Sequence, residues 1–244
     1  LFISHGSPML ALQPGASGPA LAQLAQRLPR PRAILVVSAH WESHDLRVGS
    51  AAKPDTWHDF RGFPAELYQV QYPAPGAPQL AAEVAERLAQ AGLPAQLDAE
   101  RPLDHGAWVP LTLMYPQANI LVVQVSLPSQ QGPALQRRVG QVLAGLRDNG
   151  VLLIGSGSIT HNLRMLFGGG PRPALNAPEI PQSAAFRTWF AERSADADWT
   201  ALADYRALAP HAALMHPTDE HLLPFYVAAG AGGHAGVKSP FALI

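Results

Sequence analysis

The chain has no cysteine among its 244 residues, which excludes disulfides, thiolate nucleophiles and cysteine-based zinc or iron–sulfur centres. Charged residues make up only 14% of the sequence and the formal net charge is -1, so nothing indicates a nucleic-acid or membrane-surface partner. No apolar run reaches the length of about 18 residues expected of a transmembrane helix. We therefore expect a cytoplasmic protein that binds neither nucleic acid nor membrane.

Apolar segments of two kinds alternate along the chain. Short runs rich in Val, Ile and Leu, with little polar alternation, predict strands of a mainly parallel sheet that is covered on both faces. They span residues 1–4, 33–39, 119–127 and 151–158. Apolar residues spaced three and four apart predict helices between and after them. These span residues 18–28, 77–93, 132–150, 182–193 and 199–214.

Glycine and proline mark the ends and connections of these segments. Gly92 and Gly150 are plausible helix stops, and residues 72–78 and 168–182 are rich in Pro and Gly, typical of loops. The second loop could cover a site. Because strands and helices alternate, we predict one α/β domain over residues 1–244, with a mainly parallel central sheet flanked by helices.

Ten histidines stand against the low charge, and any transition-metal site must be built from His, Asp and Glu. His5, His40 and His161 each follow closely on the C-terminal end of a predicted strand. In open α/β sheets the ligand crevice lies beyond those ends, so these side chains are expected to converge there. One histidine in such a place is more often a structural residue. Three in the same topological position favour a shared metal or catalytic site.

The remaining histidines carry weaker signals. His216 and His221 are five residues apart, or about 140° around a helix, so they would not share a helix face. Pro224 fits the first turn of a helix that begins near His221, and we expect at most one of the two histidines to join the strand-end group. The others are interpreted as surface or loop residues, namely His44, His58, His211 and His234.

Imidazole ligands suit iron, zinc, copper or nickel, and three protein ligands leave positions open for substrate. The residues alone therefore predict a metal enzyme with an open site. They do not choose between hydrolysis and oxidation.

Seven sequence motifs resemble those of one enzyme family, the class III extradiol ring-cleavage dioxygenases, and within it the 4,5-DOPA extradiol dioxygenase branch. They are "HGSPM" (5–9), "VVSAHW" (36–41), "HDFRGFPAELYQVQYPAPG" (58–76), "LDHGAWVPLTLMYP" (103–116), "VVQVSL" (122–127), "GSGSITHNLR" (155–164) and "PTDEHLLPFYVAAGA" (217–231). Members of this family open catechol-type rings beside the paired hydroxyls with non-haem Fe(II) and O₂, and some bacterial members hold zinc.

The resemblance implies a role for each candidate residue. His5, His40 and His221 match the metal ligands of this branch, with Glu220 a minor competitor for the third position. His161 matches the acid/base histidine, which can also lie close enough to the metal to count as a ligand. His105 lies in a family motif and is expected to contact substrate or oxygen, whereas His216 falls at a variable position.

The resemblance also implies the reactants, a DOPA-like or other small catechol with O₂, and Fe(II) as the active metal with Zn(II) as an alternative occupant. Two other functions stay open. One is a zinc-dependent hydrolase in which Glu220 or His161 activates a metal-bound water. The other is a non-catalytic binding member of the superfamily. Either a monomer or a homodimer fits the sequence.

Overall fold

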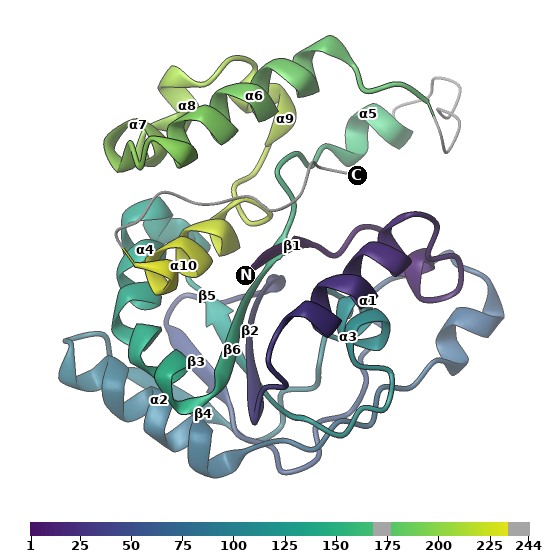
Figure 1. Ribbon diagram of the computed structural model, residues 1–244, viewed down its shortest axis with the longest axis vertical. Helices are drawn as coiled ribbons and strands as arrows, with labels where there is room; N and C mark the ends of the chain where they lie inside the picture. Colours follow the sequence, from purple (N-terminus) through teal and green to yellow (C-terminus); the bar gives the residue numbers. More distant parts are fainter. Residues whose placement is uncertain (168–176, 234–244) are drawn as a thin grey trace.

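The computed structural model describes residues 1–167 and 177–233, which are built around one β-sheet (Figure 1). Its strands are β1 (Phe2–Ser4), β2 (Ala33–Glu42), β3 (Leu46–Gly49), β4 (Ala95–Asp98), β5 (Leu121–Leu127) and β6 (Val151–Gly157). The strand order is β1-β6-β2-β5-β3-β4, and every neighbouring pair is parallel except β3 and β5. The predicted mainly parallel sheet is thus confirmed.

Helices cover both faces of this sheet and form a further layer above it (Figure 1). They are α1 (Ser17–Arg27), α2 (Pro78–Gln90), α3 (His105–Met114), α4 (Gly132–Leu143), α5 (Leu163–Phe167), α6 (Pro181–Ala195), α7 (Trp199–Ala203), α8 (Tyr205–Leu208), α9 (Ala212–Met215) and α10 (Leu223–Gly232). Short 3₁₀ turns span Pro8–Ala11, Ala65–Gln69, Ser129–Gln131 and Ala144–Asn149. None of the helices in the described ranges is long and apolar enough to cross a bilayer.

Both faces of the central strands are buried, which explains why their sequences do not alternate with polar residues. Along β2, Ile34 and Val36 pack in one apolar cluster with α1 and α3. Leu35 and Val37 point into the other cluster, with α2, α4 and α10. All four side chains are at most 1% exposed. The central strands therefore carry the two halves of the core.

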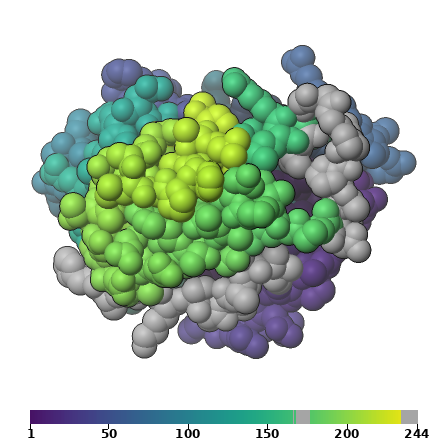
Figure 2. All heavy atoms as spheres, turned by 90° about the horizontal axis from the view of Figure 1, so that it is seen from above, coloured from purple at the N-terminus to yellow at the C-terminus, as the bar shows by residue number. Residues whose placement is uncertain are grey.

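The layer formed by α6, α7, α8 and α9 lies at the end of the molecule where β1 and β6 finish (Figure 1). Seen from above, this layer, green to yellow-green, spreads over much of that end (Figure 2). The chain returns from α9 through residues 216–222 to α10, which packs against β6 and α4. This return places a C-terminal segment beside the first strand of the sheet.

Some sequence predictions differ from the observed elements. Strands β3 and β4 were not predicted because they are short and partly exposed. Helix α3 was also missed, since it is apolar all round and contains Pro110, and so shows no amphipathic period. The helix predicted over 199–214 is instead three short helices. The helical conformation is interrupted at His211, whose φ is 58° and which directly precedes α9.

Helix boundaries elsewhere agree with the sequence. Gly92 and Gly150 both adopt positive φ, as expected of residues that end helices. The predicted helix over 132–150 is α4 followed by a 3₁₀ turn that ends at Gly150. Of the predicted loop over 168–182, residues 168–176 lie outside the described residues, and Pro181 already begins α6.

Candidate metal centre and its surroundings

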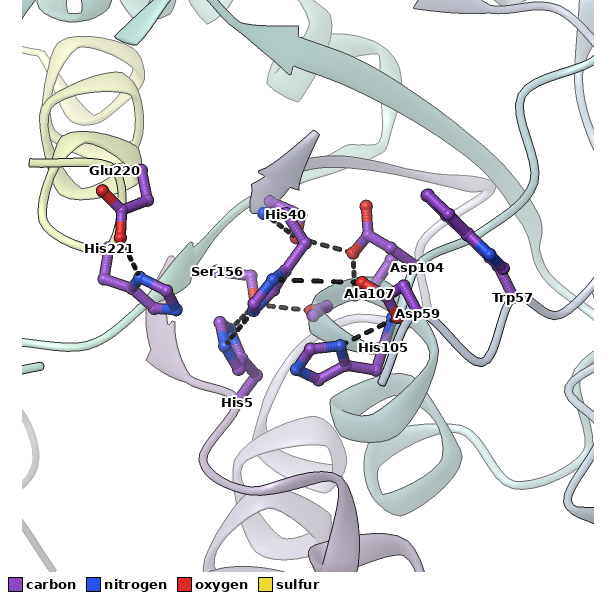
Figure 3. A network of polar contacts seen from close by, with 12 residues as sticks. His5, His40, Trp57, Asp59, Asp104, His105, Ala107, Ser156, Glu220 and His221 are labelled. Atoms are coloured by element: carbon purple, nitrogen blue, oxygen red, sulfur yellow. Dashed lines mark hydrogen bonds and ion pairs between the residues drawn. The ribbon is translucent and has the colours of Figure 1, made fainter. Parts of the chain in front are cut away.

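Three histidines from distant parts of the chain meet at the C-terminal edge of the sheet (Figure 3). His5 directly follows β1, His40 lies near the end of β2, and His221 lies in the segment that leads into α10. Each offers a ring nitrogen, and these three atoms lie within 4.8 Å of one another. The Nε2 atoms of His5 and His40 are 3.0 Å apart. The structure thus brings together the three residues predicted as metal ligands.

The position of His40 differs slightly from the prediction. It lies inside β2, which continues to Glu42, and not past the end of the strand. The pairing of β2 with β5 changes register between Val37 and Glu42. We infer that this irregularity allows the His40 ring to turn toward His5 at the strand end.

Hydrogen bonds fix the proton of His5 on the nitrogen that points away from the centre. The Ser156 hydroxyl donates to the backbone oxygen of Gly106, so its oxygen is left to accept. The Nδ1 atom of His5 lies 3.0 Å from that oxygen and must be the donor. Nε2 of His5 therefore carries a lone pair directed at His40, which is the form of histidine that ligates a metal.

His221 is oriented in the same manner by its neighbour Glu220. Its Nδ1 atom lies 2.9 Å from Glu220 Oε1, and its Nε2 atom is buried with no hydrogen-bond partner. Burial alone would raise the pKa of Glu220, but hydrogen bonds from His221 and Thr218 lower it to about 2. Glu220 is thus an ionised acceptor behind His221, an arrangement common behind metal-bound histidines.

Gly157 explains how His221 can approach the sheet so closely. A Cβ atom at Gly157 would lie 2.0 Å from the backbone oxygen of His221. The same oxygen accepts a hydrogen bond of 3.0 Å from the backbone N–H of Ser158. The end of β6 and the segment carrying His221 are therefore in direct backbone contact, which only glycine permits.

Two imidazoles of the centre, those of His5 and His40, favour their neutral form. Burial, followed by the neighbouring histidines, lowers the pKa of His5 well below its ordinary value and lowers the pKa of His40 to about 3. Neutral imidazole is the ligating form. A buried Nε2 without a partner on His221, next to the Nε2 lone pair of His5 and the Nε2 atom of His40, fits a transition-metal cation that accepts nitrogen ligands. The donor set therefore suits the metal implied by the sequence.

A second group of side chains adjoins the first through His40. Asp59 Oδ1 accepts a 3.0 Å hydrogen bond from the backbone N–H of His105 and lies 2.9 Å from its Nδ1 atom. Asp59 Oδ2 lies 3.9 Å from His40 Nδ1. The rings of His40 and His105 have centroids 3.9 Å apart. His105 thus lies beside the three converging histidines, with a carboxylate behind it (Figure 3).

His161 lies on the other side, against His221. The two rings are stacked with their centroids 3.4 Å apart and their planes 9° from parallel. The backbone N–H of His161 donates to Met215, which ties the loop after β6 to α9. Burial, followed by the neighbouring His221, lowers the pKa of His161 to about 4. His161 is thus a neutral imidazole at the edge of the centre at neutral pH.

Behind His40, the buried carboxylate of Asp104 accepts several hydrogen bonds. It caps α3 through the backbone N–H of Ala107 and accepts from the Ser38 hydroxyl at 2.7 Å. It also accepts from Arg101 at 2.8 Å and from the Gln124 amide at 2.5 Å. Because Ser38 also accepts from the backbone N–H of His40, this group fixes the strand end that carries His40.

Arg101 is the cation of this group. Its guanidinium carbon lies 4.7 Å from the ring centroid of Trp41 and 4.8 Å from that of Trp57, a cation–π arrangement on two sides. It also donates to the backbone oxygen of His40 at 3.2 Å. Arg101 therefore supports His40 from behind without facing the centre.

The other histidines lie away from the centre. His44 is exposed and pairs with Asp45, and His58 bonds to a backbone oxygen within a cluster of aromatic rings. His211 is an exposed turn residue, and His234 lies outside the described residues. His216 was not predicted as a ligand. It is fully buried, and its Nε2 atom contacts the backbone oxygen of Ile159.

Three supporting residues were missed from the sequence, namely Asp59, Ser156 and Arg101. Asp59 and Ser156 lie in motifs that were noted, "HDFRGFP" and "GSGS". The signal for Asp59 was a carboxylate next to a histidine in an aromatic loop. No periodicity or spacing predicts that its partner would be His105.

Comparison with known proteins agrees with this geometry. The family model of the catalytic LigB subunit of aromatic ring-opening dioxygenase matches residues 1–242. The 4,5-DOPA dioxygenase extradiol of Beta vulgaris is 42% identical over 236 residues, covering 95% of this chain and 86% of that protein. The 4,5-DOPA dioxygenase extradiol of Escherichia coli K12 is 38% identical over 237 residues, covering 95% and 84%.

A crystal structure of an uncharacterized protein from Escherichia coli K12 superposes with a TM-score of 0.72 at 33% sequence identity, covering 89% of this chain and 82% of that one. Of the functions that the sequence left open, these matches favour ring cleavage over hydrolysis or simple binding. The chain belongs to the family of the catalytic LigB subunit of aromatic ring-opening dioxygenases, and it is a metal-dependent extradiol dioxygenase of catechol-type rings.

Proposed function

We propose that His5, His40 and His221 hold Fe(II), with Zn(II) as an alternative occupant, and that the substrate is DOPA or another small catechol that reacts with O₂. The observation that carries the proposal is the convergence of three oriented imidazoles, with the Nε2 atoms of His5 and His40 3.0 Å apart and that of His221 buried and unpartnered. When bound, Fe(II) supplies redox chemistry and coordination sites for the catechol oxygens and O₂.

The protein ligands of this centre carry no charge, unlike a set of two histidines and one carboxylate. The nearest carboxylates, Glu220 and Asp59, instead stand behind histidines. A neutral ligand set leaves the full charge of the cation available to stabilise a catechol anion. Catechol hydroxyls are thereby expected to lose protons on binding.

His161 and His105 flank the centre and are the proposed catalytic residues. His161 is neutral at neutral pH because burial lowers its pKa to about 4, so its ring can accept a proton from a hydroxyl and later return one. His105 lies next to His40 and is expected to contact substrate or oxygen. Holding these groups around one substrate orientation supplies the usual advantage of proximity.

The test is anaerobic reconstitution with Fe(II), followed by O₂ uptake and absorbance with a panel of catechols that includes L-DOPA and caffeate. A yellow ring-opened product with one O₂ consumed per catechol supports the proposal and ranks the substrates. One bound iron per chain without O₂ uptake on any catechol would contradict it.

Variants separate the proposed roles. His40→Ala is expected to lose the metal, whereas His161→Ala is expected to retain it and lose most turnover. His44→Ala is the matched control, because the His44 side chain is 92% exposed and lies away from the centre. Complete loss of metal from His161→Ala would make His161 a ligand first. A cytoplasmic location and a monomeric or homodimeric state stay predictions from the sequence.

A further inference from the structure

Asp59 occupies a distinctive place beside the centre. Its carboxylate comes from the loop between β3 and α2, and its side chain is 8% exposed. One oxygen, Oδ1, receives both the backbone N–H and the Nδ1 atom of His105, at 3.0 and 2.9 Å. The other oxygen faces His40 Nδ1 at 3.9 Å. One carboxylate is thus placed against two histidines of the site.

These contacts fix both the proton and the orientation of the His105 ring. An ionised carboxylate only accepts hydrogen bonds, so Nδ1 of His105 must carry the proton. Although burial alone would raise the pKa of Asp59, its bond with His105 lowers it and keeps the carboxylate ionised. Nε2 of His105 is then left with a lone pair, and it has no hydrogen-bond partner in the part of the chain that the structure describes.

His161 lacks a comparable arrangement. No carboxylate in the described ranges bonds to its ring, because Glu220 bonds to His221 and Thr218. The two flanking histidines also stand on different sides, with His105 beside His40 and His161 stacked on His221. A catechol has two hydroxyl protons to lose, and of the two flanking histidines only His105 has a carboxylate hydrogen-bonded to its ring, where it would stabilise an imidazolium. The Glu220 carboxylate lies within 4.8 Å of a His161 ring nitrogen but bonds to His221 instead.

We propose that Asp59 is a positioning residue for ring cleavage, which holds His105 with its Nε2 lone pair toward the substrate as the acceptor of one catechol hydroxyl proton. This inference rests on the proposed function above. In this step the hydroxyl O–H bond breaks and an Nε2–H bond forms. The catechol oxygen keeps the electron pair, and the Asp59 carboxylate offsets the positive charge of the resulting imidazolium.

A purely structural role for Asp59 is the rival explanation. Its Oδ1 atom also satisfies the first backbone N–H of α3, as a helix cap would. Loss of a cap would lower stability without a specific effect on turnover. The two explanations therefore differ in what happens when His105 is already absent.

The experiment compares Asp59→Ala, His105→Ala and the double variant, each loaded with Fe(II), for kcat, KM and metal content. We expect Asp59→Ala to lower kcat about 10- to 100-fold with little change in KM or bound metal, as for other supporting residues. In the double variant, kcat should equal that of His105→Ala, because Asp59 acts through that ring. Independent, multiplicative losses would overturn the proposal.

Two further variants sharpen the comparison. Asp59→Asn keeps an amide oxygen where Oδ1 accepts both His105 bonds, so it is expected to retain clearly more kcat than Asp59→Ala. Equal losses in the two variants would contradict positioning by hydrogen bonds. The control is Asp198→Ala, which removes the cap of α7, a 3.0 Å bond to the Ala201 N–H, and is expected to cost stability alone.

A measurement independent of turnover separates this inference from the proposed function. Nitrogen-15 NMR of the diamagnetic zinc-loaded protein reports which ring nitrogen of His105 carries the proton. The wild-type protein should show the Nδ1–H form, and Asp59→Ala should lose this preference. An Nε2–H form in the wild type would overturn the inference, even if Asp59→Ala does not fold. If no catechol is cleaved, the proposed function fails while this readout still decides the role of Asp59.

Discussion

Replacing Arg101 by Met should destabilise the protein far more than removing a surface arginine. Arg101 is paired with Asp104 at 2.8 Å, and the two side chains are 12% and 0% exposed. Removing one partner of a buried pair typically costs about 3–5 kcal/mol, because the remaining charge stays buried. Ser38 and Gln124 still donate to Asp104, so we expect the lower end of that range.

Urea unfolding of the metal-free protein measures this effect. With an m-value of about 3 kcal/mol/M, a loss of about 3 kcal/mol lowers the midpoint by about 1 M. Methionine keeps an apolar stem between Trp41 and Trp57, so the variant retains packing there while it loses the charge and its hydrogen bonds. The control is Arg87→Met, which removes an i,i+4 pair with Glu83 whose side chains are 34% and 35% exposed. That loss should be about 0.3–0.5 kcal/mol.

A double variant tests the reason for the loss. Arg101→Met/Asp104→Asn removes both charges while an amide oxygen can still cap α3. The double variant should lose less stability than the two single variants lose together. Each single variant leaves one buried charge unpaired, whereas the double variant leaves none. Strict additivity, or an Arg101→Met loss no larger than that of Arg87→Met, would refute the reasoning.

Three other predictions concern the centre and its supports. Gly157→Ala should weaken metal binding, because its Cβ would lie 2.0 Å from the His221 backbone oxygen. Gly232→Ala is the control and should bind metal normally, since its Cβ would meet no atom of the described residues within 4 Å. Equal affinities of the two variants in a metal titration would count against this account. Zinc-loaded protein should bind catechols in calorimetry yet consume no O₂, since Zn²⁺ has no redox chemistry; O₂ consumption would contradict this. Burial lowers the pKa of His216 from 6.5 to about 4. Between these two pH values the unfolded chain binds a proton that the folded protein does not, so the free energy of unfolding should fall as the pH drops from 6.5 to about 4. At and below about pH 4 this loss of stability reaches about 3 kcal/mol. The urea midpoint of His216→Gln should therefore fall less steeply with decreasing pH than that of the wild type.

The strand-end histidines were predictable because a parallel sheet imposes a common direction on its strands. Apolar runs before His5 and His40 identify buried strands, and parallel pairing brings their ends to one edge. His221 could not be reached that way. It follows no strand, and its place in the centre was implied only by the family resemblance.

The contacts of Asp59 with His105 and of Ser156 with His5 could not be predicted from the sequence. Asp59 lies in a loop without periodicity, and its bond to His105 depends on how that loop packs against α3. Ser156 lies between two glycines at the end of β6, so its hydroxyl is indistinguishable from any buried strand serine until His5 is placed beside it. Such contacts are set by tertiary packing, which local sequence patterns do not encode.

The distance along the chain between His5 and His221 has a consequence for the stability of the fold. With no cysteine, the chain has no disulfide to join its ends. A cation held by both residues would act as a crosslink between the first strand and the segment before α10. Since the unfolded chain offers no such preformed site, metal at 100 times its Kd would stabilise the native state by about 2.7 kcal/mol. The supply of the metal would then determine the lifetime of the folded protein as well as its turnover.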